Sequence, residues 1–216
     1  MGLFVKKDKK YNDNINIQRK ALFEVEDPEL AELALAGLDC DQLPNARGDF
    51  GNFFRNPIIT NGIQGTLIYL SKLIVARTKT GIIFHRLGSI KNSLTNVGSI
   101  DIYEIMDETG THWDILFVDM FHPRRTNLTP NGYYLKDYDH DLGDSNKSFG
   151  TVRTCDNFPY RIVSSLIASG NSRYAIVEEI LKNLDDSGVI LTPPEDHRKK
   201  VEAIKQILEQ QAKDND

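Results

Sequence analysis

The sequence lacks the features that would anchor a chain in a membrane or cross-link it. Only two cysteines occur in 216 residues, Cys40 and Cys155, and they form neither a disulfide ladder nor a CxxC metal knuckle. No run approaches the roughly 18 uninterrupted apolar residues that a membrane span needs. The apolar start at Met1 is too short for a signal peptide. We therefore expect a cytoplasmic protein in a reducing compartment, without membrane insertion.

The sequence also lacks the short motifs of common catalytic and nucleotide-binding sites. It has no GxSxG, and it has no GxGxxG or GxxxxGK[ST] loop. The acidic segment Asp137–Asp144 resembles a calcium loop at first, but Leu142 stands at the sixth position, where an EF-hand has glycine, and Ser148 at the twelfth, where it has glutamate. A transition-metal site from His122, Asp139 and His140 has no ligand spacing to support it. We expect no metal and no cofactor.

Carboxylates are missing from one long block of the chain. Between Asp49 and Asp101 there is neither Asp nor Glu, while the block carries six lysines and arginines. Such a block favours anion binding, or its charges pair with the acidic segment that follows. The net charge of −5 argues against a polyanionic partner. We therefore expect no binding to nucleic acid.

What is present is typical of one folded domain. Hydrophobic residues make up 40% and charged residues 26% of the chain, and 216 residues are enough for a single core. We predict a flexible basic arm over 1–20, one α+β domain over 21–212 and a frayed tail over 213–216. Within the domain we predict a helix over 27–37, an aromatic loop over 43–65, a sheet over 66–136 and a helical region over 159–212.

The sheet prediction is based on segments rich in β-branched and aromatic residues. Turns that end in glycine, Thr78–Gly81 and Asp107–Gly110, separate two of the pairs, which indicates antiparallel neighbours. In Trp113–Met120 both alternating sets of side chains are apolar, so this strand should be central and covered on both faces. We predict an antiparallel β-meander of four to five strands, covered by N-terminal and C-terminal helices. Its strands are Thr66–Ala76, Ile82–Leu87, Ser99–Met106, Thr111–Phe121 and a short Tyr133–Lys136.

Histidines and arginines near strand ends are the candidates for anion binding and proton transfer. We take Arg86, Arg124 and Arg125 as candidate anion-binding residues. The candidate catalytic residues are His85, His122 and Asp119.

The same residues have structural interpretations. Turn geometry predicts that Met106 pairs with Thr111 and that Gly88 pairs with Ser99, and this register places Arg86 opposite Asp101. The predicted ion pair and a histidine among apolar neighbours would then be structural rather than catalytic.

Phe50, Phe53 and Phe54 are the candidate protein-interface residues, because three phenylalanines in a loop must either bind a partner or plug the core. Our first hypothesis is a non-enzymatic protein that acts through protein–protein contacts, as an adaptor or a subunit of a larger assembly. The alternative is an enzyme of unknown type that acts on a phosphate- or carboxylate-bearing small molecule. The sequence does not determine the oligomeric state.

Overall fold

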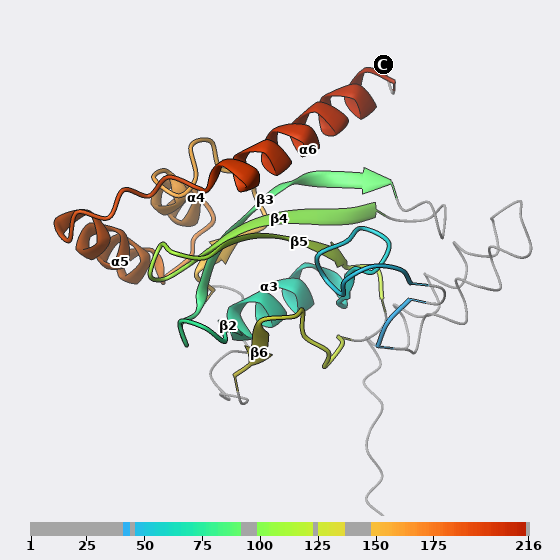
Figure 1. Cartoon of the computed structure of the whole chain (residues 1–216), viewed down its shortest axis with the longest axis horizontal. Coiled ribbons are helices and arrows are strands. Elements are labelled where there is room, and N and C mark those ends of the chain that lie inside the picture. Colours follow the sequence, from blue (N-terminus) through green and yellow to red (C-terminus); the bar gives the residue numbers. More distant parts are fainter. Residues whose placement is uncertain (1–40, 44–45, 92–98, 123–124, 137–147, 215–216) are drawn as a thin grey trace, which may run out of the picture.

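The computed structural model describes residues 41–43, 46–91, 99–122, 125–136 and 148–214 (Figure 1). The predicted arm over 1–20, the helix over 27–37, the acidic segment and Arg124 lie outside these residues. The described part is an α+β fold. Its helices are α3 (Gly62–Lys72), α4 (Ile162–Ala168), α5 (Tyr174–Asp186) and α6 (Glu195–Lys213). Its strands are β1 (Ile58–Ile59), β2 (Leu73–Val75), β3 (Ile82–Lys91), β4 (Ser99–Asp107), β5 (Trp113–Asp119), β6 (Tyr133–Leu135) and β7 (Gly150–Thr151).

The main sheet has five strands in the order β1-β5-β4-β3-β7. Strands β3, β4 and β5 form an antiparallel meander, as predicted. The two outer strands correct the prediction, because β1 pairs in parallel with β5 and β7 pairs in parallel with β3. The sheet is therefore mixed, and β4 rather than β5 is the central strand. Each outer strand has only two residues, too few for an alternating pattern to reveal it in the sequence.

The first predicted strand, Thr66–Ala76, is mostly helix. Helix α3 ends at Lys72, and only Leu73–Val75 is extended, as β2. The β-branched content misled the prediction, because the buried residues of α3 include Thr66, Tyr69 and Leu70, which follow helical spacing. Strand β2 pairs with β6 in a separate two-stranded ribbon, so the predicted fifth strand exists but lies outside the main sheet.

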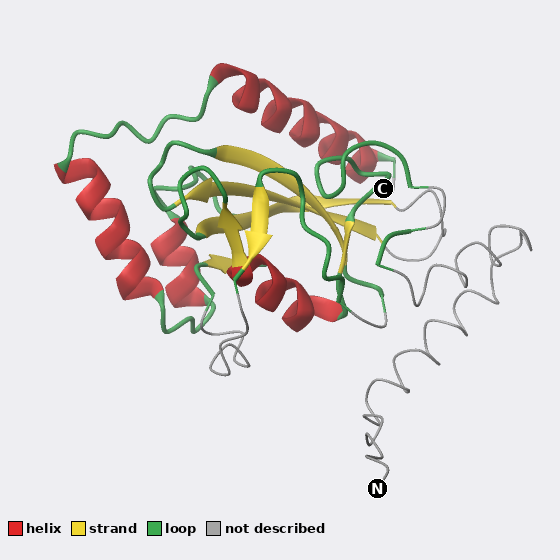
Figure 2. Ribbon diagram, turned by 60° about the horizontal axis from the view of Figure 1, so that its bottom comes forward, coloured by secondary structure: helices red, strands yellow, loops and turns green. Residues whose placement is uncertain are grey.

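The main sheet is covered on both faces, as Figures 1 and 2 show. On one face α3 packs through Leu67 and Leu70 against side chains such as Phe84 and Leu116. On the other face α4 and α5 pack near Ile83 and Met106 of the sheet. Helix α6 packs on that second face through Val201. The side chains of β5 contribute to both faces, which confirms the two-sided burial predicted for this strand.

The strand register differs from the prediction. Met106 pairs with Trp113 instead of Thr111, because the Asp107 carboxylate accepts the backbone N–H groups of Thr111 and His112, each at 2.9 Å, and holds them in the turn. In β3 the register shifts between Arg86 and Gly88.

The shift in β3 is a β-bulge that brings the strand against α6. Gly88 pairs with Ile102, and a Cβ atom on Gly88 would come within 2.5 Å of Leu208 of α6. The helix therefore approaches the sheet closely where β3 has no side chain. Within the described residues, no helix has the length and apolar character needed to cross a membrane.

Candidate functional site

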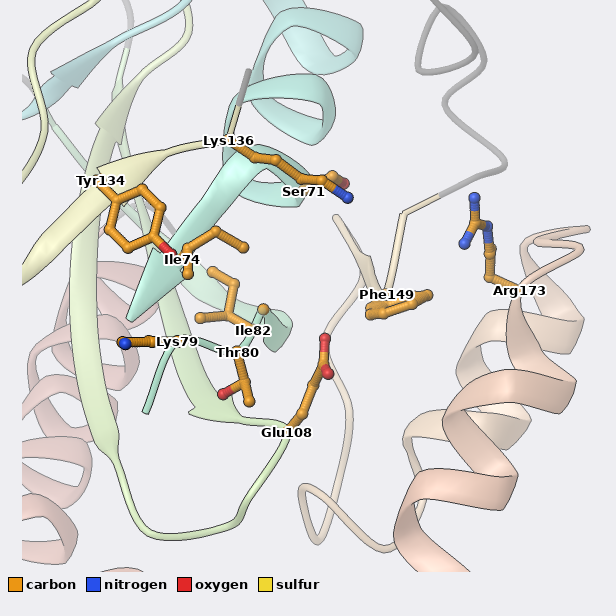
Figure 3. Close-up of a pocket in the computed structure, with 11 residues that line it drawn as sticks. Ser71, Ile74, Lys79, Thr80, Ile82, Glu108, Tyr134, Lys136, Phe149 and Arg173 are labelled. Atoms are coloured by element: carbon orange, nitrogen blue, oxygen red, sulfur yellow. The ribbon is translucent and has the colours of Figure 1, made fainter. Parts of the chain in front are cut away.

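A cavity of about 400 Å³ opens between the β2–β6 ribbon, the turn before β3 and the start of α5. Its floor includes Ile74 and Ile82, and Tyr134 and Phe149 contribute aromatic walls. Figure 3 shows Ser71 and Lys136 on one side of the cavity and Glu108 on the opposite side. The other lining residues are Lys79, Thr80, Gly81 and Arg173. The cavity thus combines an apolar floor with a charged rim.

Three of the described lining side chains are cationic. Lys79, Lys136 and Arg173 form no ion pair with any residue in the described part of the chain. The Arg173 guanidinium lies 5.5 Å from the centre of the Phe149 ring, so it is held by a cation–π contact. Glu108 is the single carboxylate among the described lining residues, so these residues together carry an excess of positive charge.

Local backbone structure positions these cations. Lys79 has a positive φ of 58° in the tight turn after β2, where its backbone N–H donates to the carbonyl of Val75. Lys136 follows β6, and its N–H donates to the Lys72 carbonyl at 2.8 Å. Arg173 precedes α5, and its N–H donates to Oδ1 of Asn171. Three separate segments therefore bring their charges to one opening.

The Glu108 carboxylate is held at the wall of this cavity. Burial raises the pKa of Glu108 above its ordinary value, and the nearby Asp107 carboxylate raises it further. A hydrogen bond from the Gly81 N–H and the positive charge of Lys136 oppose this rise. A Cβ atom on Gly81 would lie 2.5 Å from Glu108 Oε1, so the glycine leaves room for the carboxylate. Glu108 is thus a lining carboxylate whose pKa is raised by its surroundings.

A second cluster of ionisable groups lies on the α6 side of the sheet. Glu104 of β4 accepts hydrogen bonds from His85 of β3 through Oε2 and from His197 of α6 through Oε1, both at 2.9 Å. All three residues are buried. Burial opposes the charged form of Glu104, but the hydrogen bonds from His197 and His85 outweigh it and lower the pKa of Glu104 to about 2. An ionised carboxylate therefore joins two strands to a helix.

Both ring nitrogens of His85 take part in hydrogen bonds. Its Nδ1 accepts the backbone N–H of Cys155 at 3.1 Å, so the proton is on Nε2, which donates to Glu104. Burial raises the pKa of the Cys155 thiol, which opposes its activation as a nucleophile. Within the described residues, no group of three or more His, Cys, Asp or Glu side chains is placed to hold a metal ion. The described contacts of the cluster join β3, β4 and α6.

The other two candidate catalytic residues, Asp119 and His122, lie away from His85. Asp119 pairs with Ile100, four positions along β4 from Glu104, which corresponds to roughly 13 Å along the strand. Burial raises the pKa of Asp119 to about 6, although a hydrogen bond from the Phe121 N–H opposes this. His122 is buried after the end of β5, and its N–H donates to the Thr60 carbonyl. None of the three candidates lines the cavity.

The candidate anion-binding arginines also lie apart from the cavity. Arg86 Nε is 3.0 Å from Asp101 Oδ1, and Ser89 hydrogen-bonds to both residues, so the predicted ion pair is present. It forms despite the wrong register, because the bulge in β3 leaves Arg86 and Ser89 on the same face as Asp101. Arg125 lies close enough to Tyr69 to oppose the rise in the Tyr69 pKa that burial causes.

The three phenylalanines of the aromatic loop have different environments. Phe50 packs against the core cluster on the α3 side of the sheet. Phe53 is 39% exposed, and its ring centre lies 4.8 Å from that of Phe54. The Arg55 guanidinium lies 5.5 Å from the centre of the Phe54 ring. Phe50 is therefore an internal anchor, and Phe53 and Phe54 form the more accessible pair.

The sequence contained a partial signal for the cavity. Lys79 belongs to the block without carboxylates, where an excess of positive charge was predicted. Lys136 and Arg173 belong to other segments, and no spacing rule connects them to Lys79. His197 was missed for the same reason, because it lies 93 residues from Glu104.

Comparisons of the chain with models of known protein families, with curated proteins and with solved structures find no match.

Proposed function

We propose that the protein binds a small anionic molecule with an apolar or aromatic body in the cavity of about 400 Å³. The observation that carries this proposal is that Lys79, Lys136 and Arg173 all line one cavity and form no ion pair with another described residue. The positive charge of these three side chains favours an anion in the cavity.

The size and lining of the cavity agree with this ligand class. Small-molecule sites commonly measure about 300–1,000 Å³ and combine apolar walls with a few polar groups that fix orientation. Here Ile74 and Ile82 provide apolar surface, and the aromatic rings of Tyr134 and Phe149 provide surfaces for a planar group.

The proposal concerns binding, because the histidines suggested for proton transfer do not line the cavity. The proposed ligand is of the same class as in the enzyme hypothesis, an anionic small molecule. The proposed binding residues are different, because they are the cations of the cavity and not Arg86, Arg124 and Arg125.

The test is a calorimetric titration with toluene-4-sulfonate, inorganic phosphate and citrate. Toluene-4-sulfonamide, which is uncharged, serves as the control ligand. We expect saturable binding of at least one anion, weakened about tenfold or more by Lys136→Ala or Arg173→Ala, as expected for a lost charge-assisted contact. Lys182→Ala, an exposed cation on α5, is the matched control and should bind as the wild type does. Absence of saturable binding, or equal affinity in all variants, would reject the proposal.

A second candidate function is contact with a protein partner through the aromatic loop, as in the first hypothesis. The observation that favours it is the exposure of Phe53 beside Phe54. The test is recovery of partners from native lysate with a Phe53→Ser, Phe54→Ser double variant. A variant that stays folded and keeps every partner would count against this function.

A further inference from the structure

We propose that anion binding in the cavity is coupled to protonation of Glu108, so that the site takes up one proton together with its ligand. This inference rests on the proposed function and specifies how that site is regulated. Its basis is the position of Glu108, a half-buried carboxylate in the wall of a cavity whose other charged lining residues, among those described, are cations.

The geometry explains the coupling. The glycine opposite Glu108 leaves no side chain between the carboxylate and the Gly81 backbone, and Lys136 is the cation whose charge acts on Glu108 most directly. An anion that enters the cavity replaces water and places a second negative charge near Glu108. Both changes disfavour the ionised carboxyl, so the proton affinity of Glu108 rises when the ligand binds.

The other polar side chains that line the cavity also bear on the charge of Glu108. Lys79 in the turn after β2, Lys136 after β6 and Arg173 before α5 each contribute a cationic side chain. Tyr134 of β6 contributes a phenol. Glu108 is the one carboxylate among the described lining residues.

The neighbouring carboxylate, Asp107, is held ionised. Burial opposes its charge, but its oxygens accept hydrogen bonds from the Thr109 hydroxyl at 2.6 Å and from the N–H groups of Thr111 and His112 at 2.9 Å, and its pKa is lowered. Asp107 therefore adds a constant negative charge beside Glu108. This charge favours the protonated form of Glu108 further.

The sign of the pH dependence follows directly. Protonated Glu108 does not repel an anion, whereas ionised Glu108 does, so affinity should decrease as pH rises through the titration of Glu108. The dissociation constant can increase by at most about tenfold per pH unit for one coupled proton.

The experiment measures the dissociation constant of toluene-4-sulfonate from pH 5 to pH 8 by calorimetry, in buffers of different ionisation enthalpy. The sulfonate keeps its charge over this range, so any change comes from the protein. We expect wild-type affinity to fall about three- to tenfold as pH rises, with net proton uptake on binding. Glu108→Gln should bind independently of pH and more tightly than wild type at pH 8. Glu202→Gln, an exposed carboxyl on α6, should retain the wild-type profile.

A second measurement does not depend on the folding of a variant. The carbon-13 shift of the Glu108 carboxyl in wild-type protein should titrate at higher pH when the sulfonate is present. Binding with a constant affinity, no proton uptake and an unmoved Glu108 titration would reject the coupling and leave the proposed function intact. A pH dependence retained in Glu108→Gln would also reject it. Absence of saturable binding would reject the proposed function itself.

Discussion

Buried carboxylates on the two inner strands β4 and β5 differ in how many donors they receive. Glu104 receives two histidine N–H groups, and Asp107 receives a hydroxyl and two backbone N–H groups. Asp119 accepts the Phe121 N–H, and the nearby Asp101 charge raises its pKa further. The hydrogen-bond donors offset the cost of burying the charges of Glu104 and Asp107. The buried charge of Asp119 is not offset in this way, so it lowers the stability of the folded protein.

We predict that Asp119→Asn stabilises the protein at neutral pH. The pKa of Asp119 is raised from 3.8 to about 6, so native Asp119 contributes stability below pH 4 that is lost as pH rises through 6. Asparagine keeps the acceptor for the Phe121 N–H and removes the buried charge. The free energy of unfolding in urea should rise by about 1–3 kcal/mol at pH 7.5.

The same comparison at pH 4 is the control for this substitution, because Asp119 is then protonated in the native state. The gain from Asp119→Asn should be much smaller there. A gain of equal size at both pH values would show that the buried charge of Asp119 is not its cause.

We predict that Phe50 contributes more to the free energy of unfolding than Phe53 does. Phe50→Ala should lower the free energy of unfolding by about 2–4 kcal/mol, because Phe50 packs against the core. Phe53→Ala, at a side chain that is 39% exposed, should lower it by less than about 1 kcal/mol. Urea denaturation of both variants measures the difference. Equal losses would contradict the assignment of Phe50 as the internal anchor.

At the scale of elements, α6 is attached to the sheet by one buried polar contact as well as by apolar packing. His197 donates to Glu104, and its ring centre lies 5.6 Å from that of Trp113. Val201 continues the contact one turn later. The remaining turns of α6 are largely exposed, so the contribution of His197 to docking should be large.

We predict that His197→Ala lowers the free energy of unfolding by about 2–3 kcal/mol at pH 7, because it removes a hydrogen bond to a buried charge. The pKa of Glu104 is lowered from 4.5 to about 2, so its stabilisation is present above pH 4.5 and is lost as pH falls toward 2. Without His197 this pKa rises, and acid unfolding should begin at higher pH. Acid titration followed by circular dichroism measures the midpoint.

The matched control is Lys199→Ala, two residues away on the same helix. Lys199 pairs with Glu195 at 2.8 Å, but both side chains are about 70% exposed, so the loss should be below about 0.5 kcal/mol. If both variants lost the same stability, helix propensity rather than the Glu104 contact would explain the effect.

The elements that the sequence predicted well are those with long and regular patterns. Strands β3, β4 and β5 and the helices α5 and α6 were located from alternation and helical spacing. The assignment of residues 66–72 to a strand was wrong, because composition was weighed above the spacing of the residues that α3 buries. The outer strands β1 and β7 pair with residues about 60 or more positions away, and local sequence patterns do not encode such contacts.

At the scale of the whole molecule, the candidate site depends on contacts between distant segments. The carboxylate-free block that contains Lys79 is visible in the sequence, but no local pattern connects this block to Lys136 or Arg173. Arg86, the candidate anion-binding residue of the same block, pairs with Asp101 in the structure. Arginines on regular strands find partners across the sheet, whereas cations in turns and at helix starts stay accessible, and the fold determines which of them meet.

The short outer strands also govern how the sheet resists association with other chains. A long unpaired edge strand is a template for aggregation. Here β1 covers the end of β5, and the Gly51 carbonyl accepts the Phe117 N–H beside it. On the other side β7 covers β3, and the Arg153 carbonyl accepts the Arg86 N–H. Local opening of either segment would uncover a long strand of the meander, so intermolecular strand pairing should begin at these two edges before the core unfolds.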